Sequence, residues 1–170
     1  MSGSFGLLVA SACELQKQGA SFEEVCKWLI VYRVSYNHRD FDSLYDMIVY
    51  ASFVALGFAC FENVLYVFEA GILTGLARAV TAVPGHVCDG IFMGLYLAFS
   101  KYYYVNGNIS LGKKYKRLSL IIPIITHGIY DFCLFLKSTL FIYIFLVYVA
   151  IIFAICFKKI NQISRNNIKL

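Results

Sequence analysis

Acidic and histidine side chains occur near the middle of segments that are otherwise apolar enough to lie in a membrane. In chain order they are Glu62 with Asn63 in 48–68, His86 with Asp89 in 79–99, and His127 with Asp131 in 118–136. A charged group in the hydrocarbon core costs several kcal/mol, so it seldom persists there without a task. Each of these side chains is therefore a hypothesis for a functional site, and their recurrence in successive segments strengthens it.

Two of the histidines and one glutamate fall at a similar depth. With a rise of ~1.5 Å per residue, Glu62, His86 and His127 lie roughly 15–24 Å along their helices from charged residues at the segment ends. Two neutral imidazoles and a carboxylate at one level form a donor set for a divalent metal. Zinc accepts both kinds of ligand and keeps a position for water in catalytic sites. We therefore predict Glu62, His86 and His127 as metal ligands.

A fourth segment, 21–34, opens with the paired acids Glu23 and Glu24. Either carboxylate can act as the general base on the attacking water. Asp131 lies four residues after His127, on the same helix face, where it can bind the metal or fix the imidazole as a hydrogen-bond acceptor.

Each of these residues also has a purely structural interpretation. Lys27 lies at i+4 from Glu23 and at i+3 from Glu24, so all three can form an ordinary salt bridge. A lone membrane histidine is more often a packing residue than a ligand. Asn63 can bridge two helices, Asp46 can cap the first full span, and Asp89 can pair with His86 or make a neutral polar contact. The combination of residues, more than any one of them, favours chemistry.

The composition predicts that membrane-spanning helices position these acidic and histidine side chains. Hydrophobic residues make up 60% of the 170 residues, against about 45–50% in soluble domains, and the excess lies in long runs. We predict an all-α, polytopic integral membrane helix bundle forming one domain over 1–170. It has full spans at 46–69, 77–101, 117–136 and 138–157, a short helix at 4–17, and a half-spanning helix that runs from Ser21 to about Val34. Ser21 as N-cap and Glu24 at N3 predict a capping box at the start of this last helix.

The net charge of +5 is distributed as expected for a membrane protein. Basic residues gather in the linker 33–45, in the loop 101–117 and in the tail after 157, which share one side if four helices span. By the positive-inside rule this side is cytoplasmic, and we expect no nucleic-acid partner. The six cysteines form no CxxC pair, which indicates small buried residues and not a disulfide framework or a zinc knuckle.

HExxH, GxSG and GxGD signatures of known proteases are absent from the sequence. Four other motifs occur in order: Glu23-Glu24-Val-Cys-Lys27; Asp46 followed by Gly57-Phe-Ala-Cys-Phe-Glu62-Asn63 and Tyr66; Arg78 with His86 and Gly94; and His127-Gly-Ile-Tyr-Asp131. In this order they resemble the PrsW family of intramembrane proteases, relatives of the CAAX prenyl endopeptidases and of bacteriocin-immunity membrane proteins. The sequence departs from the family pattern at Met47 and Ala51, where glycine is usual.

The resemblance implies a protease of the bacterial cytoplasmic membrane that hydrolyses a peptide bond of a membrane-anchored protein. The family's role is the first cleavage of an anti-sigma factor. Combined with the residue patterns, it leads us to assign Glu23, Glu24, Lys27, Asn63 and Asp131 to catalysis, and Glu62, His86 and His127 to a divalent metal, zinc being expected. The alternatives are a CAAX-type or immunity-type membrane protease, and a non-catalytic scaffold or transporter subunit.

Overall fold

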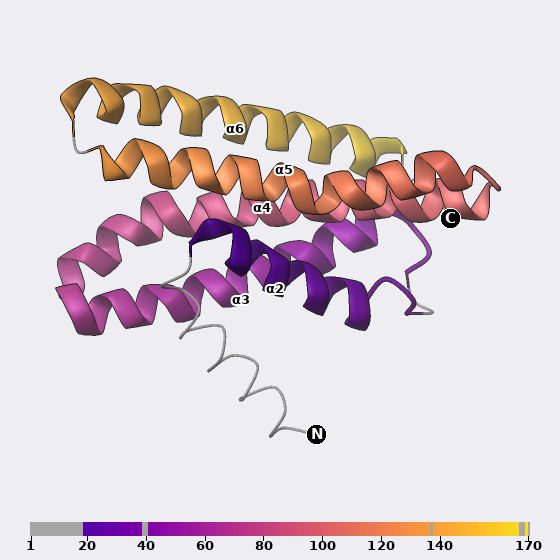
Figure 1. Ribbon diagram of the computed structural model, residues 1–170, viewed down its shortest axis with the longest axis horizontal. Helices are drawn as coiled ribbons and strands as arrows, with labels where there is room; N and C mark the ends of the chain where they lie inside the picture. Colours follow the sequence, from indigo (N-terminus) through magenta and orange to yellow (C-terminus); the bar gives the residue numbers. More distant parts are fainter. Residues whose placement is uncertain (1–18, 39–40, 137, 167–168, 170) are drawn as a thin grey trace.

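The computed structural model describes residues 19–38, 41–136, 138–166 and 169 (Figure 1). This part of the chain is helical and contains no strand, which confirms the predicted all-α fold. Its helices are α2 (Ala20–Val34), α3 (Leu44–Ala70), α4 (Ile72–Val105), α5 (Ile109–Phe135) and α6 (Thr139–Asn166). The helix predicted over 4–17 lies outside the described residues.

Helices α3 to α6 are each long and apolar enough to cross a membrane. Their 27 to 34 residues correspond to about 40–51 Å, against a hydrocarbon core of about 30 Å. Helix α2, with 15 residues, is too short to span. The prediction of four spans and one half-length helix is therefore confirmed for the described residues, and each spanning helix is long enough for its ends to project from the hydrocarbon.

Helices α3 and α4 approach each other most closely along a face of α4 that carries glycines. A Cβ atom on Gly94 would lie 2.5 Å from the carbonyl oxygen of Met47, and one on Gly90 would lie 2.8 Å from that of Ala51. Glycines four residues apart on one helix allow such a close approach of two backbones. On α3 the small residues Ala51 and Ala55 face Gly90 at this crossing. Gly71 forms the turn between α3 and α4, with φ +88°.

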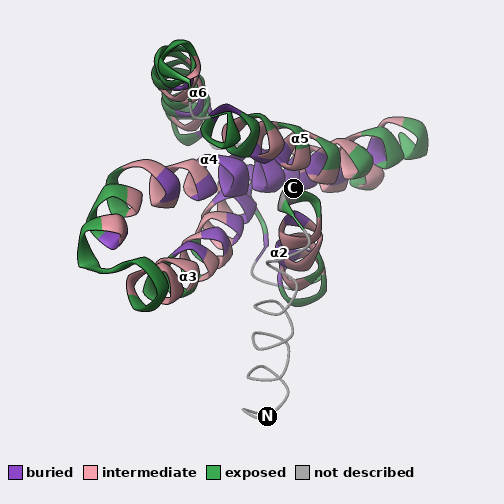
Figure 2. Ribbon diagram, turned by 60° about the vertical axis from the view of Figure 1, so that its left-hand side comes forward, coloured by how far each residue is buried: buried purple, intermediate pink, exposed green. Residues whose placement is uncertain are grey.

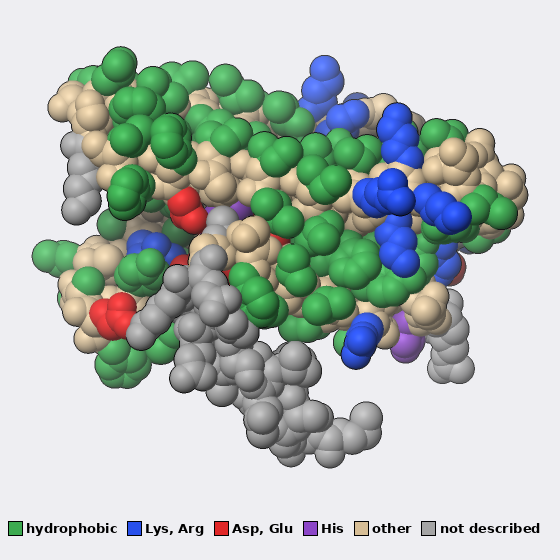
Figure 3. Space-filling view, viewed as in Figure 1, with side chains coloured by type: hydrophobic (Ala, Val, Ile, Leu, Met, Phe, Trp, Pro, Cys, Tyr) green, Lys and Arg blue, Asp and Glu red, His purple; other side chains and the backbone are tan. Residues whose placement is uncertain are grey.

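The basic loop predicted at 101–117 is wrong, because both flanking helices continue into it. Helix α4 ends at Val105 and α5 begins at Ile109, where the side chain of Asn108 accepts a hydrogen bond from the backbone of Leu111. Lysine and arginine are good helix formers, so a basic segment marks where a helix leaves the membrane, not where it ends. Helix α6 likewise runs to Asn166, into the region predicted as a tail. Lysine and arginine side chains gather in the right-hand half of Figure 3, toward the end of the bundle where α4 joins α5.

The capping box predicted at the start of α2 is also wrong. The helix begins at Ala20, with Gly19 as its N-cap at φ +95° and with no side-chain cap. Glu24 points into the bundle, where its carboxylate meets partners from its own helix and from α5. A capping interaction occurs instead at α3, where the backbone N–H of Ser43 donates to Asp46 Oδ2 at 2.8 Å, which confirms the capping alternative for Asp46.

Burial increases toward the place where α2, α3, α4 and α5 meet (Figure 2). Helix α4 is the most buried of the spanning helices and α6 the least. The short helix α2 packs against both α3 and α5. This arrangement brings the polar residues of four helices to one level inside the bundle. All five cysteines of the described residues are free thiols. Cys88, Cys133 and Cys156 are buried as predicted, whereas the prediction of burial is wrong for Cys60, which is exposed, and Cys26 is half-buried.

Candidate active site

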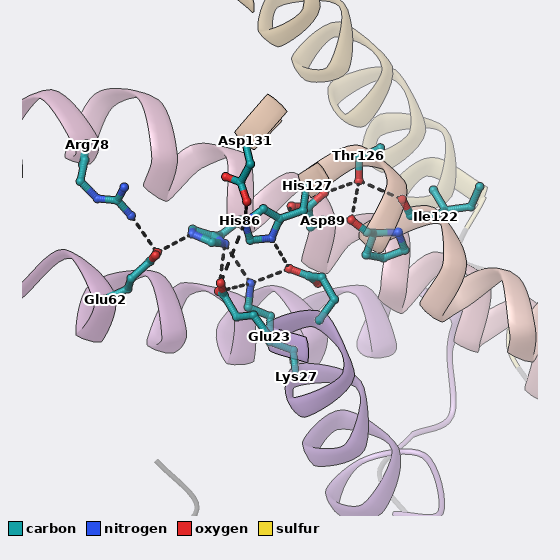
Figure 4. Close-up of polar contacts among 12 residues, drawn as sticks. Glu23, Lys27, Glu62, Arg78, His86, Asp89, Ile122, Thr126, His127 and Asp131 are labelled. Carbon is teal, nitrogen blue, oxygen red and sulfur yellow. Dashed lines mark hydrogen bonds and ion pairs between the residues drawn. The ribbon is translucent and has the colours of Figure 1, made fainter. Parts of the chain in front are cut away.

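Polar side chains from four helices converge on one cavity of about 180 Å³ (Figure 4). This volume holds several water molecules. Its charged and histidine lining comes from α2, α3, α4 and α5: Glu23, Glu62, Arg78, His86, Asp89, His127 and Asp131. The depth argument from the sequence, which placed the acids and histidines at one level, agrees with this convergence.

Lys27 lies at the centre of the cluster and is fully buried. Its Nζ lies 2.7 Å from Glu24 Oε1, 2.8 Å from Glu23 Oε1 and 2.8 Å from His86 Nδ1. A buried ammonium requires paired charges and satisfied hydrogen bonds, and these three contacts supply them. The salt bridge considered as a structural alternative is therefore present, but it lies inside the site and not on the surface.

The two histidines that line the cavity face each other edge to face, with ring centroids 4.9 Å apart. His127 Nδ1 lies 2.8 Å from Glu24 Oε1, so α5 is tied to α2. Its other nitrogen, Nε2, lies 3.9 Å from Glu23 Oε2 and 3.7 Å from Asp131 Oδ2. On the opposite side, His86 Nε2 lies 2.9 Å from Glu62 Oε2.

The structure distinguishes the two acids of α2, which the sequence leaves equivalent. The side chain of Glu23 lines the cavity and is 13% exposed, whereas that of Glu24 is 0% exposed and is enclosed between Lys27 and His127. Only Glu23 of the pair can therefore contact water in the cavity. Glu24 holds two of its neighbours in place.

A divalent metal, which the family resemblance implies, can be tested against the donor atoms. Glu23, Glu24, His86 and His127 each offer one ligand atom, all within 4.8 Å of one another. Oε2 of Glu24 is buried without a hydrogen-bond partner among the described residues. Carboxylates and imidazoles are zinc ligands, so this donor set fits. The Lys27 ammonium contacts three of the four donors, so binding an ion requires it to move aside or to lose its proton.

Glu62 was predicted as a metal ligand, and in the structure it lies beside His86 but outside the group of four donor residues. Its Oε2 contacts His86 Nε2 at 2.9 Å and Arg78 Nη2 at 2.8 Å, on the side of His86 that faces away from Lys27. The four-residue donor group contains Glu23 and Glu24 in place of Glu62.

Three further polar residues differ in how they relate to the cavity. Asn63 lies outside the cavity lining and donates to the carbonyl oxygen of Gly75 at 3.1 Å, which is the helix-bridging contact considered as its alternative. Its catalytic role stays a prediction. Asp131 lies at the cavity wall with its side chain 53% exposed. Asp89 accepts a hydrogen bond from Thr126, a residue that sequence reasoning missed although it directly precedes His127.

Arg78 and Tyr66 belong to the sequence motifs, but the motifs assign no role to either. In the structure the guanidinium of Arg78 stacks on the ring of Tyr66, with Cζ 3.6 Å from the ring centroid. Tyr66 lies one turn after Glu62 on α3, and this i, i+4 spacing was the available signal. Both residues line the cavity beside Glu62.

Comparisons with a family model and with curated proteins identify the same family. A family model described as PrsW family intramembrane metalloprotease matches residues 4–156. Protease PrsW of Geobacillus kaustophilus (strain HTA426) is 34% identical over 157 residues, covering 92% of this chain and 67% of that protein. Protease PrsW of Oceanobacillus iheyensis is 40% identical over 147 residues, covering 85% and 66%. Protease PrsW of Clostridioides difficile (strain 630) is 34% identical over 152 residues, covering 87% and 63%.

The chain spans about two thirds of the length of these relatives. No solved structure matches it. The motifs that suggested the resemblance are the same segments that meet at the cavity, and the family model extends across all of them. The chain therefore belongs to the PrsW family of intramembrane metalloproteases.

Proposed function

We propose that this chain is an intramembrane endopeptidase that cleaves a membrane-anchored protein, with Glu23 as the general base. The observation that carries the proposal is the position of the Glu23 carboxylate. It lies at a cavity between helices of membrane-spanning length, 3.4 Å from His86 Nδ1 and 3.9 Å from His127 Nε2. A base beside two imidazoles, at a cavity large enough for water, is the arrangement that peptide hydrolysis needs.

In the proposed reaction Glu23 takes a proton from a cavity water as the water oxygen attacks the scissile carbonyl carbon. A new C–O bond forms, the carbonyl oxygen becomes an oxyanion, and the peptide C–N bond then breaks. The proton held by Glu23 passes to the leaving nitrogen. Nε2 of His127 lies toward the cavity and, when it carries a proton, is a donor for the developing oxyanion.

The remaining residues of the cluster hold this arrangement together. Lys27 links both acids of α2 to α4, and Glu24 links α2 to His127 of α5. Three of the four donor residues, Glu24, His86 and His127, would hold a divalent ion, and Glu23 beside them stays available as the base. Such an ion supplies Lewis-acid activation of water and of the scissile carbonyl. Zinc is the metal that we propose, from the mixed carboxylate and imidazole donors.

The substrate class follows from where the site lies. The cavity opens among helices that are apolar outside, so a peptide bond reaches it from a segment embedded in or anchored to the bilayer. The family role adds an anti-sigma factor as the proposed substrate. We further propose a bacterial cytoplasmic membrane, with the basic end of the bundle in the cytoplasm.

Reconstitution in liposomes with a single-span substrate protein tests the proposal. Glu23→Gln keeps the shape of the side chain but cannot accept a proton, and loss of a general base typically costs about 10²–10⁴-fold in rate. Glu69→Gln is the matched control, because Glu69 is an exposed acid of α3 outside the cavity lining. Cleavage by Glu23→Gln at the parental rate would reject the assignment and favour the scaffold alternative.

A further inference from the structure

A line of ionic contacts crosses the bundle from the outer part of α4 to the centre of the site. Arg78 Nη2 lies 2.8 Å from Glu62 Oε2, and the same oxygen lies 2.9 Å from His86 Nε2. On the other side of the ring, His86 Nδ1 lies 2.8 Å from Lys27 Nζ. His86 is therefore held between a carboxylate and an ammonium, one on each ring nitrogen (Figure 4).

These two partners determine where the proton of a neutral His86 sits. An ammonium has three donors and no acceptor, so Nδ1 must accept from Lys27. Lys27 is an ammonium because it lies between the carboxylates of Glu23 and Glu24. With Nδ1 as acceptor, the proton lies on Nε2 and is donated to Glu62. A carboxylate on the outer nitrogen of a histidine is a common way to fix its tautomer and its orientation.

We propose that Glu62 and Arg78 are a positioning pair that holds the ring of His86 with Nε2–H outward and with the Nδ1 lone pair toward Glu23 and Lys27. In this role Glu62 acts through His86 and does not contact the reacting atoms. Nδ1 is then the nitrogen available to the donor group of Glu23, Glu24 and His127. The catalytic consequence rests on the proposed function, whereas the placement of the proton does not.

Arg78 is suited to keep Glu62 in place. Its guanidinium stacks on Tyr66, which is on the same helix as Glu62, and its own helix also carries His86 two turns later. The side chains of Arg78 and Glu62 are 19% and 14% exposed, so the pair lies at the cavity edge with partial access to water. The charge-assisted contact with the guanidinium holds the Glu62 oxygen on the side of the carboxylate that faces the imidazole.

The chain contains three histidines, so nitrogen NMR of histidine can test the proposal directly. The protein is labelled with ¹⁵N-histidine and reconstituted in lipid bilayers, and His38→Gln removes the signal of the exposed third histidine. We expect His86 to show a protonated Nε2, a bare Nδ1 and a downfield Nε2–H proton, as expected for a bond to a carboxylate. His86 carrying its proton on Nδ1, or on both nitrogens, would overturn the proposal.

Variants of the pair complete the test. In Glu62→Leu we expect the Nε2–H proton to move upfield, the His86 ring to lose order, and kcat to fall roughly 10–100-fold with little change in KM. Glu62→Gln keeps an acceptor oxygen and should restore ring order and part of kcat. Arg78→Met should move the Nε2–H proton in the same direction as Glu62→Leu. Glu69→Leu, which removes an exposed carboxylate of the same helix, should change none of these signals.

A purely structural pair that only joins α3 to α4 gives a different result. It predicts a loss of thermal stability in Glu62→Leu with unchanged His86 signals, and that outcome overturns the proposal. The signals of His127, which pairs with Glu24, report whether each variant keeps its fold. The NMR measurement and the cleavage assay test different proposals. If the parent protein cleaves no substrate, the protease assignment is rejected, but the His86 signals still show where its proton lies.

Discussion

Nζ of Lys27 lies 2.8 Å from Nδ1 of His86, a residue 59 positions further along the chain. This contact joins the short helix α2 to α4 and places a positive charge among the donor atoms of the site. The ammonium and a divalent ion therefore compete for the same carboxylate and imidazole atoms. Both the competition at Lys27 and the contribution of its ion pairs with Glu23 and Glu24 to stability can be measured in variants.

Lys27→Met should make stability dependent on metal. Without Lys27, Glu23 and Glu24 lose their buried partner, and breaking such a pair typically costs about 3–5 kcal/mol. Added zinc should restore stability, because an ion that binds only the folded state raises its apparent stability by mass action. Thermal unfolding in detergent, with and without zinc, gives the measurement. An equal effect of zinc on the parent protein would show that Lys27 does not compete.

The two acids of α2 should separate into a stability role and an activity role. Glu24→Gln removes a charge that is completely enclosed between Lys27 and His127, so we expect a loss of about 3–5 kcal/mol in the free energy of unfolding. Glu23→Gln should cost less stability, since its side chain borders the cavity, but more activity. Equilibrium unfolding in mixed micelles and cleavage assays on both variants make the comparison. Equal stability losses would contradict the different burial of the two acids.

The helices and the residues of the site were largely predictable, because both depend on local patterns. Apolar runs of membrane length predicted α3 to α6, and helical rise alone placed His86 and His127 near one level. The sequence could not show where the basic helices end. Lysine and arginine mark the membrane boundary, but they are compatible both with a continuing helix and with a loop. The sequence therefore predicted a loop at 101–117 that is mostly helical.

The orientation of individual acids was not predictable from spacing. Glu23 and Glu24 are adjacent, and only the rotation of α2 against α3 and α5 decides which one meets the cavity. The partner of Glu62 depends in the same way on Arg78, which lies on the next helix after a turn at Gly71. Tertiary packing sets both relationships, and the sequence pattern contains no local signal for either.

The basic end of the bundle should lie in the cytoplasm. Asn106, in the turn between α4 and α5, and Glu69, near the end of α3, are exposed residues at opposite ends of the bundle. A cysteine at 106 should be protected from a membrane-impermeant reagent in intact cells, whereas a cysteine at 69 should react. Labelling both in opened membranes is the control for accessibility. Reaction at 106 from outside would reverse the proposed topology.

Substitution of Gly94 should test whether the α3–α4 crossing positions the site. A methyl group on Gly94 meets the backbone of Met47 and Ile48, and backbone cannot move aside as a side chain end can. Gly94→Ala should therefore destabilise the protein by about 1–3 kcal/mol, as overpacking of a tight contact does. Gly57→Ala is the matched control, because nothing lies within 4 Å of its added Cβ, and alanine should stabilise α3 there by up to about 1 kcal/mol.

Glu62 on α3 and His86 on α4 meet across this pair of helices, so Gly94→Ala should also lower the cleavage rate, whereas Gly57→Ala should not. Equal unfolding free energies for the two variants would mean that the close approach at Gly94 is not needed to hold α3 against α4.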